Sequence, residues 1–242
     1  MNHSGAMLPS IGRTVGRWVL AGALALAIIV PMTALPSFAE SGVSRQLIPI
    51  LGLTTDERAV GTVAYLALSF EERADRSGLM VHFQHGPGRI SRMAQTSTDQ
   101  AIRRAARSLG LSTDSWSVAL AVPYVGTTIY GDSLSAMVAL TVVALAKGEV
   151  IPRDRVITGT ITPDGLIGPV GGIPLKVAAA KQARLRMVLV PENHETAEGE
   201  GEASSSTQVV QVDSVSQAYQ ALTAPQSSLA GSFFLVSDEP RY

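Results

Sequence analysis

An almost uninterrupted run of hydrophobic residues occupies positions 135–146. This pattern is typical of a helix buried on all sides, because a surface helix would keep a polar stripe along one face. The run is also too short to cross a bilayer, which takes about 20 residues. We therefore expect a central buried helix, ended by Lys147 and Gly148.

Shorter stretches rich in β-branched residues predict strands before and after this helix. The clearest stretches are residues 59–70, 79–84, 116–122, 156–162, 186–191 and 208–212. The first two are expected to form a hairpin with a long charged loop. Residues 46–51 fit either a strand or a linker.

Three other helices are expected from capping signals and amphipathic spacing. Ser97 is the predicted N-cap of the first, with Gln100 in the capping-box position. Its apolar face is expected to be buried and its arginine face solvated; these faces hold Ile102, Ala105, Ala106 and Leu109 against Arg103, Arg104 and Arg107. The remaining helices are predicted over residues 175–183 and 213–222, the last capped by Asp213 or Ser214.

Strands and helices alternate without the regular order of a doubly wound sheet, so the pattern predicts an α+β or mixed α/β fold. The predicted domain covers residues 59–223, after a linker at 40–58 and before a C-terminal tail at 224–242. Residues 196–207 are acidic and rich in glycine and serine, which predicts a surface loop or a disordered insert.

The first 39 residues have the pattern of an export signal. Arg13 and Arg17 precede an apolar segment, and Ser37-Phe38-Ala39 matches a small-residue cleavage pattern. The apolar segment at 18–35 also approaches the length of a membrane anchor, which leaves membrane association open. We expect an exported protein, periplasmic or extracellular, or one anchored to the cytoplasmic membrane.

The composition excludes several classes of binding partner and of catalytic site. The 242-residue chain has a net charge of −1, 5% aromatic residues and no cysteine. Near-neutral charge with few aromatics argues against a nucleic-acid partner, and the missing cysteines exclude thiol nucleophiles and disulfides. His82 and His85 lack a third ligand nearby, so we expect no metal site and no cofactor.

A hydroxyl and an amine stand at the heads of two predicted helices. Asp132 is a suitable N-cap for the central helix, which would place Ser133 among free backbone N–H groups able to stabilise an oxyanion. Lys176 follows Pro174 in apolar surroundings. Desolvation and the helix dipole both favour its neutral form, which a general base needs. The pair therefore indicates nucleophilic acyl transfer by serine and lysine.

Other interpretations of these residues stay open at this point. Asp-Ser before an apolar helix is also what an ordinary cap looks like, a lone lysine is usually solvated, and Ser135 is a rival nucleophile. His194 and Asp213 suggest a weaker Ser-His-Asp set. The glycines at 165, 168, 171 and 172 do not match a phosphate-binding loop, because Lys176 is too far from the last of them.

Four motifs together resemble the proteolytic domain of the Lon proteases. They are Gly131-Asp132-Ser133-Leu134-Ser135, Val156-Ile157-Thr158-Gly159, the glycine turn at 165–172 leading to Ile173-Pro174-Leu175-Lys176, and Pro191-Glu192-Asn193 after a strand. The resemblance covers about residues 59–222 and includes the order and separation of serine and lysine. It implies the compact α/β fold of that domain, related to ribosomal S5 domain 2-like folds.

The resemblance also implies roles for single residues: Ser133 as nucleophile, Lys176 as general base and Thr158 as the hydroxyl that orients the lysine. Two positions depart from the family pattern. Thr160 replaces a common glutamate, and Tyr130 replaces a common acidic residue. These departures bear on the shape of the site and its substrate preference more than on the Ser-Lys dyad.

We therefore expect a Lon-like serine endopeptidase of the cell envelope that cleaves peptides or unfolded proteins. The sequence has no Walker motif, so we expect it to act without its own ATPase. The resemblance further implies homo-oligomeric rings. A catalytically silent binding or scaffolding module is the alternative, and a nucleotide-binding role ranks last.

Overall fold

A computed structural model describes residues 42–55, 57–192 and 206–225. The predicted export segment, most of the acidic loop and the tail lie outside these residues. The described residues belong to one compact unit. None of its helices has the length and apolar character needed to span a membrane.

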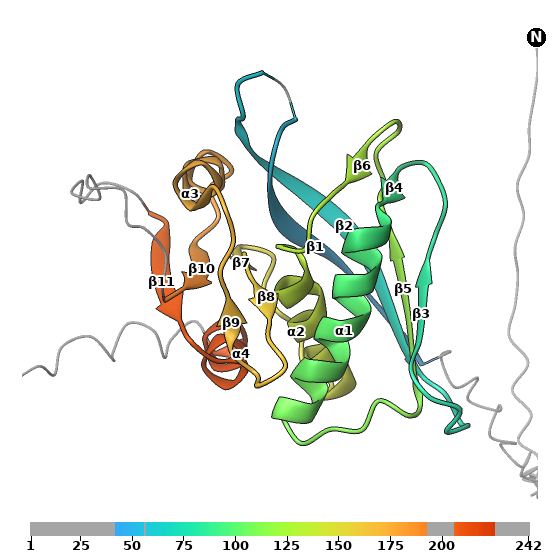
Figure 1. Cartoon of the computed structure of the whole chain (residues 1–242). Helices are drawn as coiled ribbons and strands as arrows, with labels where there is room; N and C mark the ends of the chain where they lie inside the picture. The colour runs from blue at the N-terminus through green and yellow to red at the C-terminus, as the bar shows by residue number, and fades with distance from the viewer. Residues whose placement is uncertain (1–41, 56, 193–205, 226–242) are drawn as a thin grey trace, which may run out of the picture. The chain divides into compact units, whose positions relative to one another are not determined.

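The larger sheet has four strands in the order β1-β2-β5-β3 (Figure 1). β1 (Val43–Leu53) and β2 (Gly61–Glu72) form a long antiparallel pair. β5 (Trp116–Ala121) continues the sheet antiparallel to β2, and β3 (Met80–Phe83) lies parallel to β5 at the far edge. Alternate residues of β2 and β5, including Leu66, Leu68, Val118 and Leu120, are buried on one face.

Two predictions for this region were wrong. The expected linker at 40–58 contains β1, whose Ile48 and Ile50 are buried core residues. These residues form a strand because they pair with β2 along their full length, although their sequence has no regular alternation. The expected hairpin of residues 59–70 and 79–84 does not form either, because β5 lies between β2 and β3. Both stretches are strands, as predicted, but their partners come from elsewhere in the chain.

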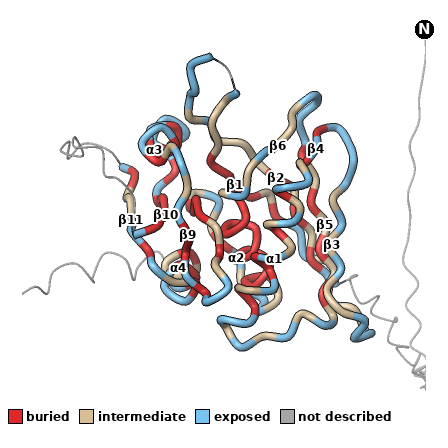
Figure 2. Tube along the Cα trace, viewed as in Figure 1, coloured by how far each residue is buried: buried red, intermediate tan, exposed pale blue. Residues whose placement is uncertain are grey.

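The central helix is α2 (Ser135–Ala146), at the predicted position. Residues 135–145 are all buried, which explains why they carry no polar face (Figure 2). α1 (Arg92–Ser108) packs against α2 and buries Ile102, Ala105 and Ala106, as predicted. Its N-cap is Ser91, six residues before the predicted cap Ser97, and the Ser91 side chain accepts a hydrogen bond from the Ala94 N–H.

A second sheet holds β7 (Arg155–Ile157), β10 (Met187–Pro191) and β11 (Gln208–Val212), all parallel, with β10 in the middle. α3 (Ile173–Gln182) leads into β10, and α4 (Val215–Thr223) follows β11 with Ser214 as N-cap. The buried guanidinium of Arg155 donates to the carbonyl oxygens of Ala221 and Leu222 and so closes the end of α4.

The predicted strand at 156–162 is split in two. β7 ends at Ile157, and β8 (Thr160–Ile161) begins three residues later to pair with β9 (Ile167–Gly168). Thr158 and Gly159 lie between them and belong to neither sheet. A further short pair joins β4 (Arg89–Ile90) to β6 (Thr128–Ile129). The mixture of parallel and antiparallel sheets around α2 confirms the predicted α/β class.

Candidate active site

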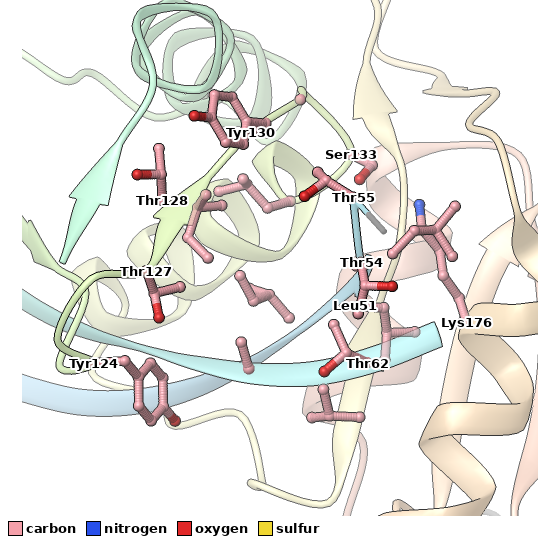
Figure 3. A pocket seen from close by; sticks show the side chains of 18 of the residues that line it. Leu51, Thr54, Thr55, Thr62, Tyr124, Thr127, Thr128, Tyr130, Ser133 and Lys176 are labelled. Atoms are coloured by element: carbon pink, nitrogen blue, oxygen red, sulfur yellow. The ribbon is translucent and has the colours of Figure 1, made fainter. Parts of the chain in front are cut away.

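A groove of about 860 Å³ opens between the β1–β2 hairpin and the segment that leads from β5 to α2. Ser133 and Lys176 both line it. Figure 3 shows the two side chains at the same end of the groove, with Tyr124 at the other end. Two of the three residues assigned to the dyad and its support therefore share one cavity, although Lys176 comes from a helix far along the chain.

Ser133 lies in the turn that precedes α2. Its carbonyl oxygen accepts a hydrogen bond from the Gly159 N–H at 2.9 Å, and its residue is partly exposed to the groove. The predicted capping by Asp132 was wrong: the N-cap is Leu134, and no side chain caps the helix. Ser133 therefore lies outside the helix, immediately before its N-cap, and not in the first turn as expected.

The first N–H groups of α2 are already occupied. The Ser135 N–H donates to the Asp132 carbonyl at 2.9 Å, and the Ala136 N–H donates to the Gly159 carbonyl at 3.2 Å. By contrast, the N–H groups of Ser133 and Leu134 have no backbone acceptor within the described part of the chain. Free N–H donors next to the groove therefore come from the turn itself and not from the helix.

The structure separates Ser133 from its rival. Ser135 is 1% exposed inside α2 and is not among the residues that line the groove. A substrate carbonyl that enters the groove can meet the Ser133 side chain, whereas Ser135 is covered by the core. The geometry thus favours Ser133 of the two serines.

Lys176 is held in the first turn of α3. Gly172 is the N-cap in the left-handed conformation, at φ 69°, and Pro174 occupies the first turn as predicted. This left-handed conformation favours glycine, and a Cβ at position 172 would also displace the end of the Leu53 side chain, whose Cδ1 lies 2.5 Å from that position. The Lys176 residue is only 3% exposed.

The Lys176 amine is therefore removed from water. Burial lowers the pKa of this ammonium below its usual value, and the negative charge of Asp132 opposes the shift. Burial is the larger of the two effects, so the pKa stays lowered and the amine loses its proton more readily than in a surface lysine. This is the direction that a general base requires.

Thr158 connects Lys176 to the turn that holds Ser133. The Lys176 Nζ donates a hydrogen bond to the fully buried Thr158 Oγ1 at 3.1 Å. The next residue is Gly159, whose N–H bonds the Ser133 carbonyl. The break between β7 and β8 thus places two consecutive residues against Lys176 and Ser133 respectively.

The sequence did not indicate the opposite wall of the groove. Residues 50–55 and 62–65 of β1 and β2 line it, but part of this region was expected to be a linker. α3 approaches this wall closely, because a Cβ on Gly61 would overlap the Leu175 carbonyl oxygen. The glycine before a β-branched run was the only local signal of such an approach.

The wall also has an open strand edge. β2 pairs with β1 over residues 61–71 but with β5 only over residues 67–72. Among the described residues, no strand pairs with residues 61–66 on the side away from β1. Residues 62–65 of this open edge line the groove that holds Ser133 and Lys176.

The other candidates are not brought to this groove. His82 lies in β3, opposite Ala119 of β5, and His194 is outside the described residues. Asp213 uses its N–H to bond the Gln217 side chain near α4. Gly165 and Gly168 belong to the β8–β9 turn, and no group of three metal-ligating side chains forms within the described ranges.

Comparison with known proteins shows similarity to several Lon proteases. The chain is 36% identical over 83 residues to the peroxisomal Lon protease homolog 2 of Xenopus laevis, 33% over 75 residues to the archaeal Lon protease of Archaeoglobus fulgidus, and 32% over 107 residues to the Lon protease of Methylocella silvestris. These matches cover 34%, 30% and 43% of this chain but only 10%, 12% and 13% of the relatives.

A family model describes the same region. The model of the Lon protease (S16) C-terminal proteolytic domain matches residues 88–223. This range contains Ser133, Thr158 and Lys176, and it runs from β4 to the end of α4. β1, β2 and β3 precede it, although they form one sheet with the matched β5. The chain therefore belongs to the family of Lon protease (S16) C-terminal proteolytic domains.

Proposed function

We propose that this protein is a Lon-like serine endopeptidase that uses Ser133 as nucleophile and Lys176 as general base. The observation that carries the proposal is the hydrogen bond between the buried Lys176 amine and Thr158, within the groove that Ser133 also lines. A lysine lowered in pKa by burial is unusual on structural grounds alone, because burial of its charge costs free energy.

The proposed reaction proceeds in two acyl-transfer steps. Neutral Lys176 takes the proton of the Ser133 hydroxyl as the Oγ attacks the substrate carbonyl. The ammonium then returns this proton to the leaving amine as the peptide C–N bond breaks, which leaves an ester on Ser133. In the second step water attacks the ester, Lys176 takes the water proton and passes it to Ser133, and the carboxylic acid is released.

The turn before α2 supplies candidate donors for the oxyanion. The N–H groups of Ser133 and Leu134 have no backbone acceptor among the described residues, and they adjoin the attacking oxygen in the chain. Donors that need no reorganisation are worth roughly 3–4 kcal/mol of transition-state stabilisation. Thr158 keeps Lys176 in place because its hydroxyl accepts from the amine.

The open edge of β2 indicates how a substrate would lie. An extended peptide can add to residues 61–66 as a strand, with its backbone bonded to β2. Such a peptide must be unfolded locally, because a folded segment does not offer its backbone groups. This supports peptides and unfolded proteins as substrates.

Export to the cell envelope belongs to the same proposal. It is supported by the basic, apolar and small-residue pattern at 13–39, which precedes the matched domain. Mass spectrometry of the mature N-terminus tests it, because a mature chain that begins at Met1 would contradict cleavage.

The proposed activity is tested with labelled casein and a short fluorogenic peptide. Ser133→Ala is expected to reduce cleavage to background, whereas Ser135→Ala is expected to keep most of it because that hydroxyl is buried outside the groove. Lys176→Arg is also expected to be inactive, because arginine does not lose its proton in proteins. Equal turnover by wild type and Ser133→Ala would overturn the assignment.

A further inference from the structure

Tyr124 lies at the end of the groove away from Ser133 and Lys176 (Figure 3). We propose that Tyr124 determines substrate specificity: its ring binds an aromatic side chain of the substrate, at about the fourth or fifth residue from the bond that is cut. The inference deepens the proposed function and rests on it, because that bond is placed at Ser133. The preference for an aromatic side chain can also be measured as binding, without any cleavage.

The catalytic end of the groove lies at the start of β2. A Cβ on Gly61 would overlap the carbonyl oxygen of Leu175, the residue before Lys176. The first residue of β2 therefore lies directly against the start of α3. Thr62, the next residue of the strand, lines the groove together with Lys176. A peptide that adds to the open edge thus has the bond to be cut near the start of β2.

Tyr124 belongs to the opposite end of the same edge. β5 stops at Ala121, which pairs with Ala67 of β2, and Tyr124 follows three residues later in the segment that leaves the sheet. A strand rises about 3.3 Å per residue, so the open edge from 61 to 66 is roughly 17 Å long. An extended peptide covers this length with about five residues. The substrate residue beside Tyr124 is therefore about the fourth or fifth from the bond that is cut.

The loop that carries Tyr124 is held by backbone contacts. The Gly88 N–H donates to the Val122 carbonyl at 3.0 Å, two residues before Tyr124. The Arg89 N–H donates to the Thr127 carbonyl at 2.8 Å, three residues after it. A Cβ on Gly88 would lie 2.6 Å from the Tyr124 carbonyl oxygen, so the loop packs directly on this glycine. Tyr124 is 38% exposed on this supported loop, and a ring held in this way loses little conformational entropy when it binds a ligand.

The chemistry of this end favours an uncharged, aromatic side chain. Lys176, at the other end, is the only lysine, arginine, aspartate or glutamate among the described residues that line the groove. A charged substrate side chain beside Tyr124 would lose water without gaining an ionic partner. Aromatic rings, by contrast, pair in stacked or edge-to-face geometry, and this adds to the free energy gained by burial. Tyr65, near the same end of the open edge, gives the groove lining a second ring.

A series of peptides tests the proposal on the intact chain. Each peptide carries one phenylalanine in a background of alanine, serine and glutamine. The phenylalanine is moved from the second to the sixth residue on either side of the bond that mass spectrometry shows to be cut. We expect kcat/KM to peak, roughly fivefold above the peptide without phenylalanine, at the fourth or fifth residue on one side.

Three variants assign this peak to the Tyr124 ring. Tyr124→Ser should remove the peak, and Tyr124→Phe should keep it, because the ring remains. Val125→Ser is the matched control and should also keep it. Val125 is 88% exposed in the same loop and does not line the groove.

The outcomes separate this proposal from the proposed function. A peak that is lost only in Tyr124→Ser supports it. A peak that persists in Tyr124→Ser, or the absence of a peak at the fourth or fifth residue on both sides, overturns it. If no peptide is cleaved, the proposed function fails, and fluorescence anisotropy with Ser133→Ala decides the role of Tyr124. Tighter binding of the phenylalanine peptides than of the background peptide, lost on adding Tyr124→Ser, supports that role; equal affinities overturn it.

Discussion

The Gly159 N–H donates to the Ser133 carbonyl oxygen at 2.9 Å, directly after the residue whose hydroxyl holds the Lys176 amine. The dipeptide Thr158-Gly159 therefore sets the position of the serine turn and of the lysine at the same time. A shift of this dipeptide would move Ser133, the proposed nucleophile, relative to Lys176, the proposed base.

The first prediction concerns Gly159→Ala. The added Cβ would approach the Ile167 Cγ2 to 2.8 Å, so the β7–β8 break must move away from β9. We expect a loss of about 1–3 kcal/mol in the free energy of unfolding. We also expect at least a tenfold fall in kcat/KM for a fluorogenic peptide. Gly42→Ala is the control, because nothing lies within 4 Å of its Cβ position; activity in Gly159→Ala equal to that control would contradict the positioning role.

The second prediction separates the Thr158 hydroxyl from general stability. Thr158→Val removes the acceptor of the Lys176 amine, and Thr141→Val removes an equally buried hydroxyl that donates to the Met137 carbonyl in α2. Both changes should cost about 1 kcal/mol of folding free energy, measured by urea unfolding. Only Thr158→Val should lower kcat, by about tenfold or more, since each factor of ten is 1.4 kcal/mol. Parallel losses of kcat in both variants would indicate a purely structural effect.

The third prediction concerns pH. Burial lowers the pKa of Lys176, and the charge of Asp132 opposes this. Because the base must be neutral, kcat/KM should rise with pH as the ammonium loses its proton. Asp132→Asn removes the opposing charge, so the pKa of Lys176 falls further and the rising limb moves to lower pH. The profile is measured with a neutral peptide from acidic to alkaline pH.

A control for this profile is Asp114→Asn, which changes a surface carboxylate paired with Arg76. Its rising limb should coincide with that of the wild type. A shift of the Asp132→Asn limb to higher pH, or no shift, would show that the carboxylate does not act on Lys176 in this way.

The fourth prediction concerns the end of α4. The buried Arg155 donates to the Ala221 and Leu222 carbonyl oxygens, so Arg155→Met leaves both acceptors unsatisfied. We expect a loss of about 1–3 kcal/mol in stability, read from the urea midpoint. Arg153→Met, at an exposed site two residues earlier, should change the midpoint little. Similar midpoints for the two variants would contradict the capping role.

The sequence predicts an element correctly where a local pattern of residues determines the local structure. The run at 135–146 is apolar on every side, and it forms α2 over these residues because the whole helix is buried. Ser214 likewise caps α4 as one of the two predicted caps. Patterns of this kind require no knowledge of partners from other parts of the chain.

The sequence does not predict strand pairing where the partner strand comes from a distant segment of the chain. Nothing near residues 43–53 reveals that β2 will pair with them along their full length, and nothing near β2 reveals that β5 will separate it from β3. The capping error at Ser97 has a different cause. Ser97 satisfies a capping rule, but Ser91 does so six residues earlier, and the Ser97 hydroxyl then donates to the Ala94 carbonyl inside the helix.

The candidate site also combines features that the sequence predicts with features that depend on tertiary pairing. Lys176 and Pro174 share a helix start, which the sequence shows, whereas the groove wall formed by β1 and β2 depends on tertiary pairing. The resemblance to Lon proteolytic domains implied a role for Thr158, and the structure shows its hydrogen bond with the Lys176 amine. The open edge at residues 61–66 could not be predicted, because it exists only where the first half of β2 extends beyond the end of β5 at Ala121.

The parallel pairing of β7 with β10 and β11 has a consequence for biosynthesis. Thr158 follows β7 directly and its N–H bonds the Leu189 carbonyl of β10, so its placement requires a strand made about thirty residues later. Parallel pairings close long loops and form slowly. A nascent chain therefore presents Ser133 before β10 has been made, and the proposed Ser-Lys site is complete only after β10 pairs with β7.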